Sequence, residues 1–198
     1  MSFEPVYGPG SRALILGSWP SPKSWEQGFY YGHPRNRFWP LLARLCGCET
    51  PGTVEEKTAL ILTHGLALWD VLESCTIEGA QDATIRNPVP VDLKRVLNAS
   101  PIEAVFCNGA AVYTLYGRFL QPVSGIPAVK LPSTSPANAA WNPDKLAEAW
   151  GKALGRFWGE DSGEKYFLLL KRFMATPHNS RLTAQAACST TWNYAVLP

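Results

Sequence analysis

The segment Arg12-Ala-Leu-Ile-Leu-Gly-Ser18 gives the first indication of the fold class. Its apolar residues follow one another without polar alternation, which predicts a strand buried on both faces, as in parallel sheets. The Gly17-Ser18 pair ends the run. Residues 17–36 follow as a loop of about 20 residues, rich in Pro, Gly and aromatic side chains. Loops of that length inside a compact domain usually carry function.

Three further apolar runs predict strands, and helical patterns separate them. We expect strands at 66–71, 102–107 and 128–131, and helices at 37–45, 53–63, 92–98, 110–119 and 143–154. The second of these helices opens with Thr53-Val-Glu-Glu56, a capping box. Because strands alternate with helices, we predict an α/β domain with a mostly parallel central sheet.

Composition bounds the class of protein. The chain has 198 residues, 46% of them hydrophobic and 17% charged, with a net charge of +2. This length supports one sizeable core. The small charge by itself does not indicate a protein that binds polyanions through bulk electrostatics. No apolar run approaches the ~18 residues of a transmembrane helix, and the N-terminus lacks a signal-peptide pattern, so we expect a cytoplasmic protein.

Cysteine and histidine usage argues against a metal site. The five cysteines are scattered, and without an export signal we expect free thiols. Cys46 and Cys48 lack the two-residue spacer of a zinc knuckle, and the three histidines lie far apart in sequence. The chain also has no GxGxxG and no GxxxxGK[ST] segment. We therefore expect neither a metal nor another cofactor.

The unusual residues gather where a parallel sheet binds ligands. Ligands bind outside the carboxyl ends of the strands, which here lead into residues 17–36, 69–90, 108–109 and 132–140. Within the first of these loops and the start of the next helix, residues 29–39 hold five aromatic side chains beside an Asn, a His and two Arg. Planar rings next to amide and guanidinium groups suit a flat heterocycle that is stacked and hydrogen-bonded.

Five motifs, in order along the chain, resemble one known family. They are Gly17-Ser-Trp-Pro-Ser-Pro-Lys-Ser24, Tyr30-Tyr-Gly-His-Pro-Arg-Asn-Arg-Phe-Trp39, Gly65-Leu-Ala-Leu-Trp-Asp-Val71, Ile85-Arg-Asn-Pro-Val89 and Leu131-Pro-Ser-Thr-Ser-Pro-Ala137. Together they resemble the hypoxanthine-DNA (deoxyinosine) glycosylase family of the uracil-DNA glycosylase superfamily. The resemblance covers about residues 8–154.

The resemblance implies a fold and an activity. The fold is a three-layer α/β/α sandwich around a four-stranded, mostly parallel sheet, which we assign to residues 1–154. The activity is that of a monofunctional hydrolase in base excision repair. It flips a deaminated base, chiefly hypoxanthine, out of DNA and breaks its N-glycosidic bond. The expected partner is DNA containing such a base, with no membrane and no obligate protein partner. Two alternatives stay open: a uracil or mismatch glycosylase, and a non-catalytic nucleotide- or DNA-binding domain on this fold.

Asn36 is the catalytic residue that the resemblance implies. Much of the superfamily positions the attacking water with an Asp or Asn where this chain has Trp19. Neither Ser18 nor Trp19 can replace a carboxylate or an amide. In the deoxyinosine branch the Asn of the His-Pro-x-Asn segment is taken to do this work, and that Asn is Asn36 here. A carboxamide can orient a water without being a strong base. The alternative is that Asn36 is only the N-cap of the helix predicted from Arg37.

Several neighbours are candidates to bind the flipped base. They are Tyr30, Tyr31, His33, Ser18 and Asn108. The two tyrosines are expected to stack on the base, unless one of them lies in the core under the loop. His33 either donates to the base or a phosphate, or fixes the His-Pro turn by a backbone hydrogen bond. Asn108 could equally make a structural bond in its loop.

A second group is expected to touch DNA outside the base. It comprises Ser133, Thr134, Ser135, Asn138 and Arg86. Small hydroxyl residues and exposed backbone amides suit a phosphate clamp, and Asn138 or a neighbour could fill the vacated stack. A Pro-bracketed Ser/Thr turn is also common in ordinary loops. Asp70 is expected only to cap a turn, and Phe38 and Trp39 are expected in the core.

Residues 155–198 differ in character from the rest of the chain. Tyr166–Met174 is an apolar run that contains Lys171-Arg172, and residues 175–198 are polar with isolated aromatics. We expect a C-terminal extension made of a helix and a loosely ordered tail.

Overall fold

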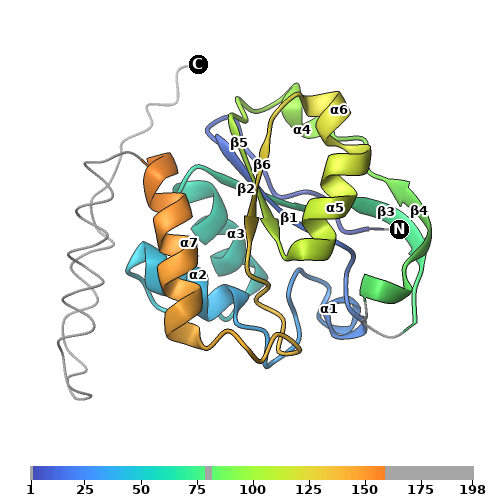
Figure 1. Ribbon diagram of the computed structural model, residues 1–198. Helices are drawn as coiled ribbons and strands as arrows, with labels where there is room; N and C mark the ends of the chain where they lie inside the picture. Colours follow the sequence, from blue (N-terminus) through green and yellow to red (C-terminus); the bar gives the residue numbers. More distant parts are fainter. Residues whose placement is uncertain (1, 79–81, 159–198) are drawn as a thin grey trace, which may run out of the picture.

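The central sheet consists of four parallel strands in the order β2-β1-β5-β6 (Figure 1). The computed structural model describes residues 2–78 and 82–158. The strands are β1 (Ala13–Gly17), β2 (Leu66–Asp70), β5 (Ala104–Asn108) and β6 (Ala128–Leu131). β1 pairs in parallel with β2 and β5, and β5 pairs in parallel with β6. The predicted four-stranded parallel sheet is confirmed.

β1 is the middle of the core. Ala13 is in register with Leu66 on one side and with Ala104 on the other, and all five residues of the strand are buried. A strand with neighbours on both edges and helices on both faces has no solvated side, which explains its uninterrupted apolar run.

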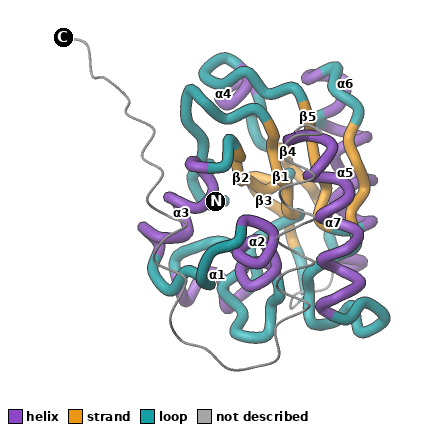
Figure 2. The backbone as a smooth tube through the Cα atoms, turned by 90° about the vertical axis from the view of Figure 1, so that its left-hand side faces the viewer, coloured by secondary structure: helices purple, strands orange, loops and turns teal. Residues whose placement is uncertain are grey.

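Helices cover both faces of the sheet. The helices α2 (Phe38–Cys46), α3 (Val54–Thr63) and α7 (Pro143–Trp158) lie on one face. The helices α4 (Lys94–Leu97), α5 (Ala110–Phe119) and α6 (Gln121–Ser124) lie on the other. Figure 2 shows the strands enclosed between helices and loops. The three-layer α/β/α sandwich is therefore confirmed. The capping box also forms, because Thr53 accepts from the Glu56 N–H and Glu56 from the Thr53 N–H.

Besides the short helix α6, another helix and a hairpin were absent from the sequence prediction. Residues 22–27 form a short helix, α1 (Pro22–Gln27), inside the long loop; Ser21 caps it and Gly28 ends it with a φ of 67°. An antiparallel hairpin pairs β3 (Leu72–Thr76) with β4 (Arg86–Pro90), and a 3₁₀ turn (Asp82–Thr84) lies between them. β4 contains two prolines, which normally argue against a strand; a two-stranded ribbon with irregular register tolerates them at its edges.

The predicted ends of several helices need correction, and α4 covers only Lys94–Leu97 of the predicted 92–98. α2 begins at Phe38, and its N-cap residue is Arg37. Asn36 therefore lies one position before the N-cap, where the sequence had predicted it to be the N-cap itself. α7 continues to Trp158, four residues past the predicted end at Leu154. The rest of the predicted C-terminal extension, residues 159–198, lies outside the described residues. Among residues 2–78 and 82–158, none of the helices has the length and apolar character that crossing a membrane requires.

The capping box gives a first prediction. Replacing Thr53 by Ala removes the side-chain acceptor for an N–H of the first turn of α3, so the free energy of unfolding should fall by about 1 kcal/mol. Urea unfolding of the two proteins measures this. Thr50→Ala, at an exposed position before the helix, is the matched control. Equal losses in both variants would contradict a capping role.

Candidate active site

The site is built at the carboxyl edge of the parallel sheet. Because the four strands run in one direction, Gly17, Asp70, Asn108 and Leu131 end at this edge together. Two loops meet there although they lie about a hundred residues apart in sequence. One is residues 28–37, which we call the motif loop, and the other is residues 132–142, which we call the Ser/Thr loop.

The side-chain oxygen of Asn36 accepts two hydrogen bonds. One comes from the backbone N–H of Phe38, at 3.0 Å, in the first turn of α2. The other comes from the hydroxyl of Thr134, also at 3.0 Å. Asn36 therefore does satisfy an N–H at the start of α2, as the alternative interpretation held, although it is not the N-cap residue. This bond leaves the predicted catalytic role open, because the amino group of the same carboxamide makes no hydrogen bond within the described residues.

Thr134 is fully buried between two asparagines. Its backbone N–H donates to Asn108 Oδ1 at 2.9 Å, and its hydroxyl accepts from Asn108 Nδ2 at 2.9 Å. The same hydroxyl donates to Asn36. A side chain with no exposed surface cannot touch a phosphate without leaving this place, so the predicted DNA contact of Thr134 is wrong. Asn108 makes the structural loop bonds that were the alternative to a base contact.

Arg37 joins the two loops through backbone carbonyls. Its guanidinium donates to the carbonyl oxygens of Thr134 at 3.2 Å, Ser135 at 2.5 Å and Asn138 at 3.1 Å, and also to that of Trp141. Its backbone N–H donates to the Thr134 carbonyl as well. The planar fork of an arginine suits such a set of acceptors, which a lysine cannot match. Sequence reasoning missed this residue. The available signal was an Arg next to Asn36 in a segment that is otherwise aromatic.

The two adjacent tyrosines of the motif loop have different environments. Tyr30 is buried, and its hydroxyl donates to the Glu4 carbonyl at 2.9 Å, so it lies in the core under the loop. The predicted base-stacking role of Tyr30 is therefore corrected. Tyr31 has a left-handed backbone with a φ of 54°. Its ring stacks on Phe38 with centroids 4.0 Å apart, and its hydroxyl is buried without a hydrogen-bond partner in the described part of the chain.

Gly17 leaves room for a buried carboxyl group. A Cβ atom at this position would stand 2.2 Å from Asp70 Oδ1 and 3.2 Å from the Tyr31 hydroxyl. Asp70 is 4% exposed, and its Oδ2 makes no hydrogen bond within residues 2–78 and 82–158. Burial, with the nearby charge of Asp82 adding to it, raises the pKa of Asp70 to about 7. Asp70 is thus a buried carboxyl group whose Oδ2 has no hydrogen-bond partner within the described residues, and it does not cap a turn as the sequence predicted.

The remaining base-binding candidates, Ser18 and His33, make hydrogen bonds within the protein. The Ser18 hydroxyl donates to Asp82 Oδ1 at 2.6 Å and so joins the end of β1 to the hairpin region. His33 Nδ1 accepts from the Arg35 N–H at 3.0 Å, and the Asn36 N–H donates to the His33 carbonyl at 2.8 Å. These are the bonds of the structural interpretation of His33, in which the imidazole fixes the His-Pro turn.

The other predicted DNA contacts lie in the Ser/Thr loop and the hairpin. Ser133 Oγ accepts from the Ser135 N–H at 3.2 Å, and Asn138 Nδ2 donates to the Ser133 carbonyl at 2.9 Å. Ser135 Oγ in turn accepts from the Ala137 N–H at 3.3 Å. These three residues stay partly exposed. Arg86 is exposed in β4 and donates to backbone carbonyls of its own turn.

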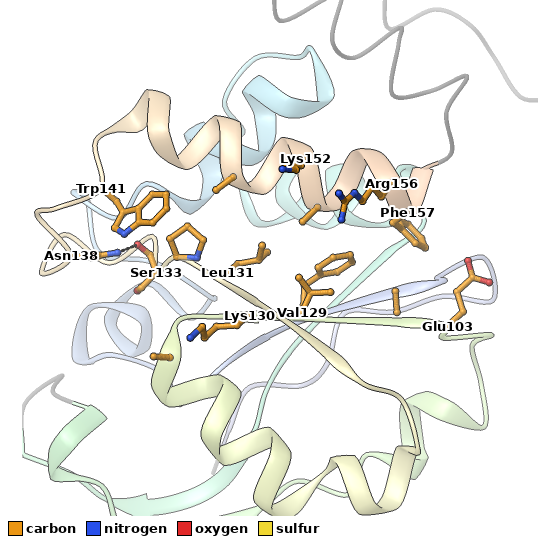
Figure 3. Close-up of a pocket in the computed structure, with 16 residues that line it drawn as sticks. Glu103, Val129, Lys130, Leu131, Ser133, Asn138, Trp141, Lys152, Arg156 and Phe157 are labelled. Atoms are coloured by element: carbon orange, nitrogen blue, oxygen red, sulfur yellow. Dashed lines mark hydrogen bonds between the residues drawn. The ribbon is translucent and has the colours of Figure 1, made fainter.

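A large groove lies to one side of the site. It has a volume of about 1030 Å³ and runs between α7 and the strands β5 and β6 (Figure 3). Ser133, Asn138 and Trp141 line one end, and Phe157 lines the other. Asn36, Asp70 and Tyr31 are not among its lining residues, so the groove is not the site built here. Among residues 2–78 and 82–158, no cluster of three or more His, Cys, Asp or Glu side chains could hold a metal ion.

Comparison with known proteins identifies the family. The sequence model of the uracil DNA glycosylase superfamily matches residues 4–154. The chain belongs to this superfamily. Similar curated proteins are the hypoxanthine DNA glycosylases of two archaea. That of Methanosarcina acetivorans is 31% identical, over 74% of this chain and 92% of its own length. That of Methanosarcina barkeri is 34% identical, over 54% of this chain and 69% of its own length.

A solved structure supports the same assignment. A solution NMR structure of a protein from M. acetivorans, provisionally assigned as a uracil DNA glycosylase, superposes with a TM-score of 0.63. It is 30% identical, and the match covers 74% of this chain and 91% of that one. The resemblance to the hypoxanthine branch of the superfamily, predicted from five motifs, is confirmed.

The clamp made by Arg37 gives a second prediction. In Arg37→Lys a single ammonium group replaces a fork that binds four carbonyls, which leaves several partly buried acceptors unpaired. The free energy of unfolding should fall by about 1–3 kcal/mol, as measured by urea denaturation. Arg35→Lys, at an exposed position two residues earlier, is the control. If both variants are equally stable, the clamp does not contribute to stability.

The burial of Asp70 gives a third prediction, on the dependence of stability on pH. An unfolded chain releases this proton near pH 3.8, and the folded protein releases it near pH 7. Between these values the folded state holds more protons, so raising the pH lowers the free energy of unfolding. Asp70→Asn removes this loss. The stability of the variant relative to wild type should therefore increase between pH 4.5 and pH 8.5, by about 3 kcal/mol.

Urea denaturation of both proteins at the two pH values measures this increase. Glu73→Gln serves as the control, because Glu73 is an exposed carboxylate on the next strand. A stability difference between wild type and Asp70→Asn that does not change with pH would contradict the raised pKa.

Proposed function

We propose that this member of the uracil DNA glycosylase superfamily is a DNA glycosylase that removes hypoxanthine from DNA. The curated relatives that carry this activity in their names match the chain at 31% and 34% identity. One structural observation supports the proposal most directly. A neutral carboxamide, that of Asn36, is held in one orientation at the carboxyl edge of the sheet, with its amino group uncommitted.

The chemistry of the N-glycosidic bond sets the requirements of the site. As the bond breaks, positive charge develops on the sugar and negative charge on the departing base. The protein must hold the extruded base, place a water beside the sugar and stabilise the leaving base with hydrogen-bond donors. None of these tasks demands a strong base, because the departing base itself takes the electron pair of the broken bond.

Asn36 meets the demand for a fixed polar group. Its oxygen already accepts from Phe38 and Thr134. The amino group remains available to donate to the oxygen of a water or to an acceptor atom of the base. Since the carboxamide is held before substrate binds, no free energy is spent on orienting it during the reaction.

Tyr31 and the Ser/Thr loop supply the surroundings. Phe38 stacks on one side of the Tyr31 ring, with the two ring centroids 4.0 Å apart. Tyr31 is therefore the tyrosine that we retain for stacking on the base. Ser133, Ser135 and Asn138 are partly exposed on a loop that Arg37 fixes, and we assign them to the DNA backbone. Phosphate contacts of this kind position a duplex without reading its sequence.

A fourth prediction tests the activity. Wild type should release hypoxanthine from a labelled duplex with a single deoxyinosine, and alkali should then cleave the strand at the abasic site. Asn36→Ala should react at least about 100-fold more slowly, because it lacks the oriented amide. Asn98→Ala, an exposed asparagine at the end of α4, should react at the wild-type rate.

The outcomes separate the candidate functions. Parallel duplexes with uracil and xanthine measure substrate breadth, and cleavage only at uracil would identify a uracil glycosylase instead. Binding to the inosine duplex without cleavage would identify a non-catalytic binding domain. If wild type leaves every duplex both intact and unbound, the assignment fails.

A further inference from the structure

Three side chains form one hydrogen-bonded chain across the site. Asn108 at the end of β5 contacts Thr134 in the Ser/Thr loop, and Thr134 contacts Asn36 in the motif loop. The distances are 2.9 Å and 3.0 Å. Thr134 is the middle member, and it is the residue of the Ser/Thr loop whose side chain is completely buried.

The direction of every bond in this chain is fixed by its two ends. The Thr134 N–H can only donate, so the atom of Asn108 that it meets is the carbonyl oxygen. The other Asn108 atom is then the amino group, and the Thr134 hydroxyl must accept from it. At the far end the Phe38 N–H can likewise only donate, so it meets the oxygen of Asn36. The single proton of the Thr134 hydroxyl therefore goes to Asn36.

The consequence falls on the carboxamide of Asn36. Both bonds hold its oxygen, one from α2 and one from the Ser/Thr loop. A rotation of the amide by 180° would place its amino group against the Phe38 N–H, which can only donate, and would take the acceptor away from the proton of the Thr134 hydroxyl. The arrangement thus admits one orientation, with the amino group directed away from both partners.

We propose that Thr134 is a positioning residue, which fixes the Asn36 carboxamide for glycosidic-bond hydrolysis through its hydroxyl and touches neither base nor phosphate. This inference rests on the proposed function. It differs from a role as a phosphate clamp, because a clamp acts on the affinity for DNA, whereas a positioning residue acts on the rate of the bound complex.

The test compares two substitutions at one position. Thr134→Val keeps the shape of the side chain and the backbone N–H to Asn108 but removes the hydroxyl. Thr134→Ser keeps the hydroxyl. Both are measured on an inosine duplex with enzyme in saturating excess, which gives the rate of the bound complex, and by titration of a duplex with a stable abasic-site analogue, which gives the Kd.

We expect Thr134→Val to lower the single-turnover rate by about 10- to 100-fold while the Kd stays within about threefold of wild type. Thr134→Ser should retain the rate. Thr114→Val is the matched control, since within the described part of the chain the Thr114 hydroxyl bonds only to a carbonyl of its own helix α5. Thermal unfolding checks that the variants fold. If Thr134→Val does not fold, Thr134→Ala takes its place in the test, because it removes the hydroxyl without adding a contact.

Three results would overturn the proposal. One is an unchanged rate in the variant without the hydroxyl. The second is a Kd that weakens in proportion to the loss of rate, which is the result for a loop that holds phosphate. The third is a loss of rate in Thr134→Ser as large as in Thr134→Val. In each case an active wild type leaves the proposed function intact, whereas a wild type inactive on every damaged duplex removes the proposed function itself.

Discussion

The site depends on one arginine that binds backbone and not side chains. Arg37 follows Asn36 directly, and its guanidinium fixes carbonyls spread over residues 134–141. Without the guanidinium, Thr134 would keep its bonds to Asn108 and Asn36. The part of the Ser/Thr loop from Ser135 to Trp141 would lose its bonds to the motif loop. The arrangement of side chains around Asn36 thus depends on a contact between two loops, which the sheet brings close together.

The general architecture could be predicted because its signals are local. The apolar run at 13–16 and the capping box at Thr53 each act within a few residues, and the structure contains both elements. The hairpin was missed because prolines such as those of β4 are typical of loops. Such prolines are tolerated only because the ribbon has free edges, which the sequence of one strand does not reveal.

The details of the site could be predicted only in part, because they depend on distant partners. Ser133, Thr134 and Ser135 are three successive hydroxyl residues, and nothing local tells which of them turns inward. Thr134 turns inward because its hydroxyl and its backbone N–H bond to Asn108, which lies 26 positions earlier in the sequence. The same holds for Tyr30 and Tyr31. One anchors the N-terminal segment and the other lies beside Asp70, and the left-handed backbone at Tyr31 separates them.

That backbone also limits how position 31 can change over evolution. A left-handed conformation costs a non-glycine residue roughly 1 kcal/mol or more, and glycine or asparagine would relieve it. Yet only an aromatic ring can stack on Phe38 as Tyr31 does. The two demands select different residues, so no common substitution satisfies both. We therefore expect drift at this position to be confined to aromatic residues, with the local strain kept as a lasting feature of the lineage.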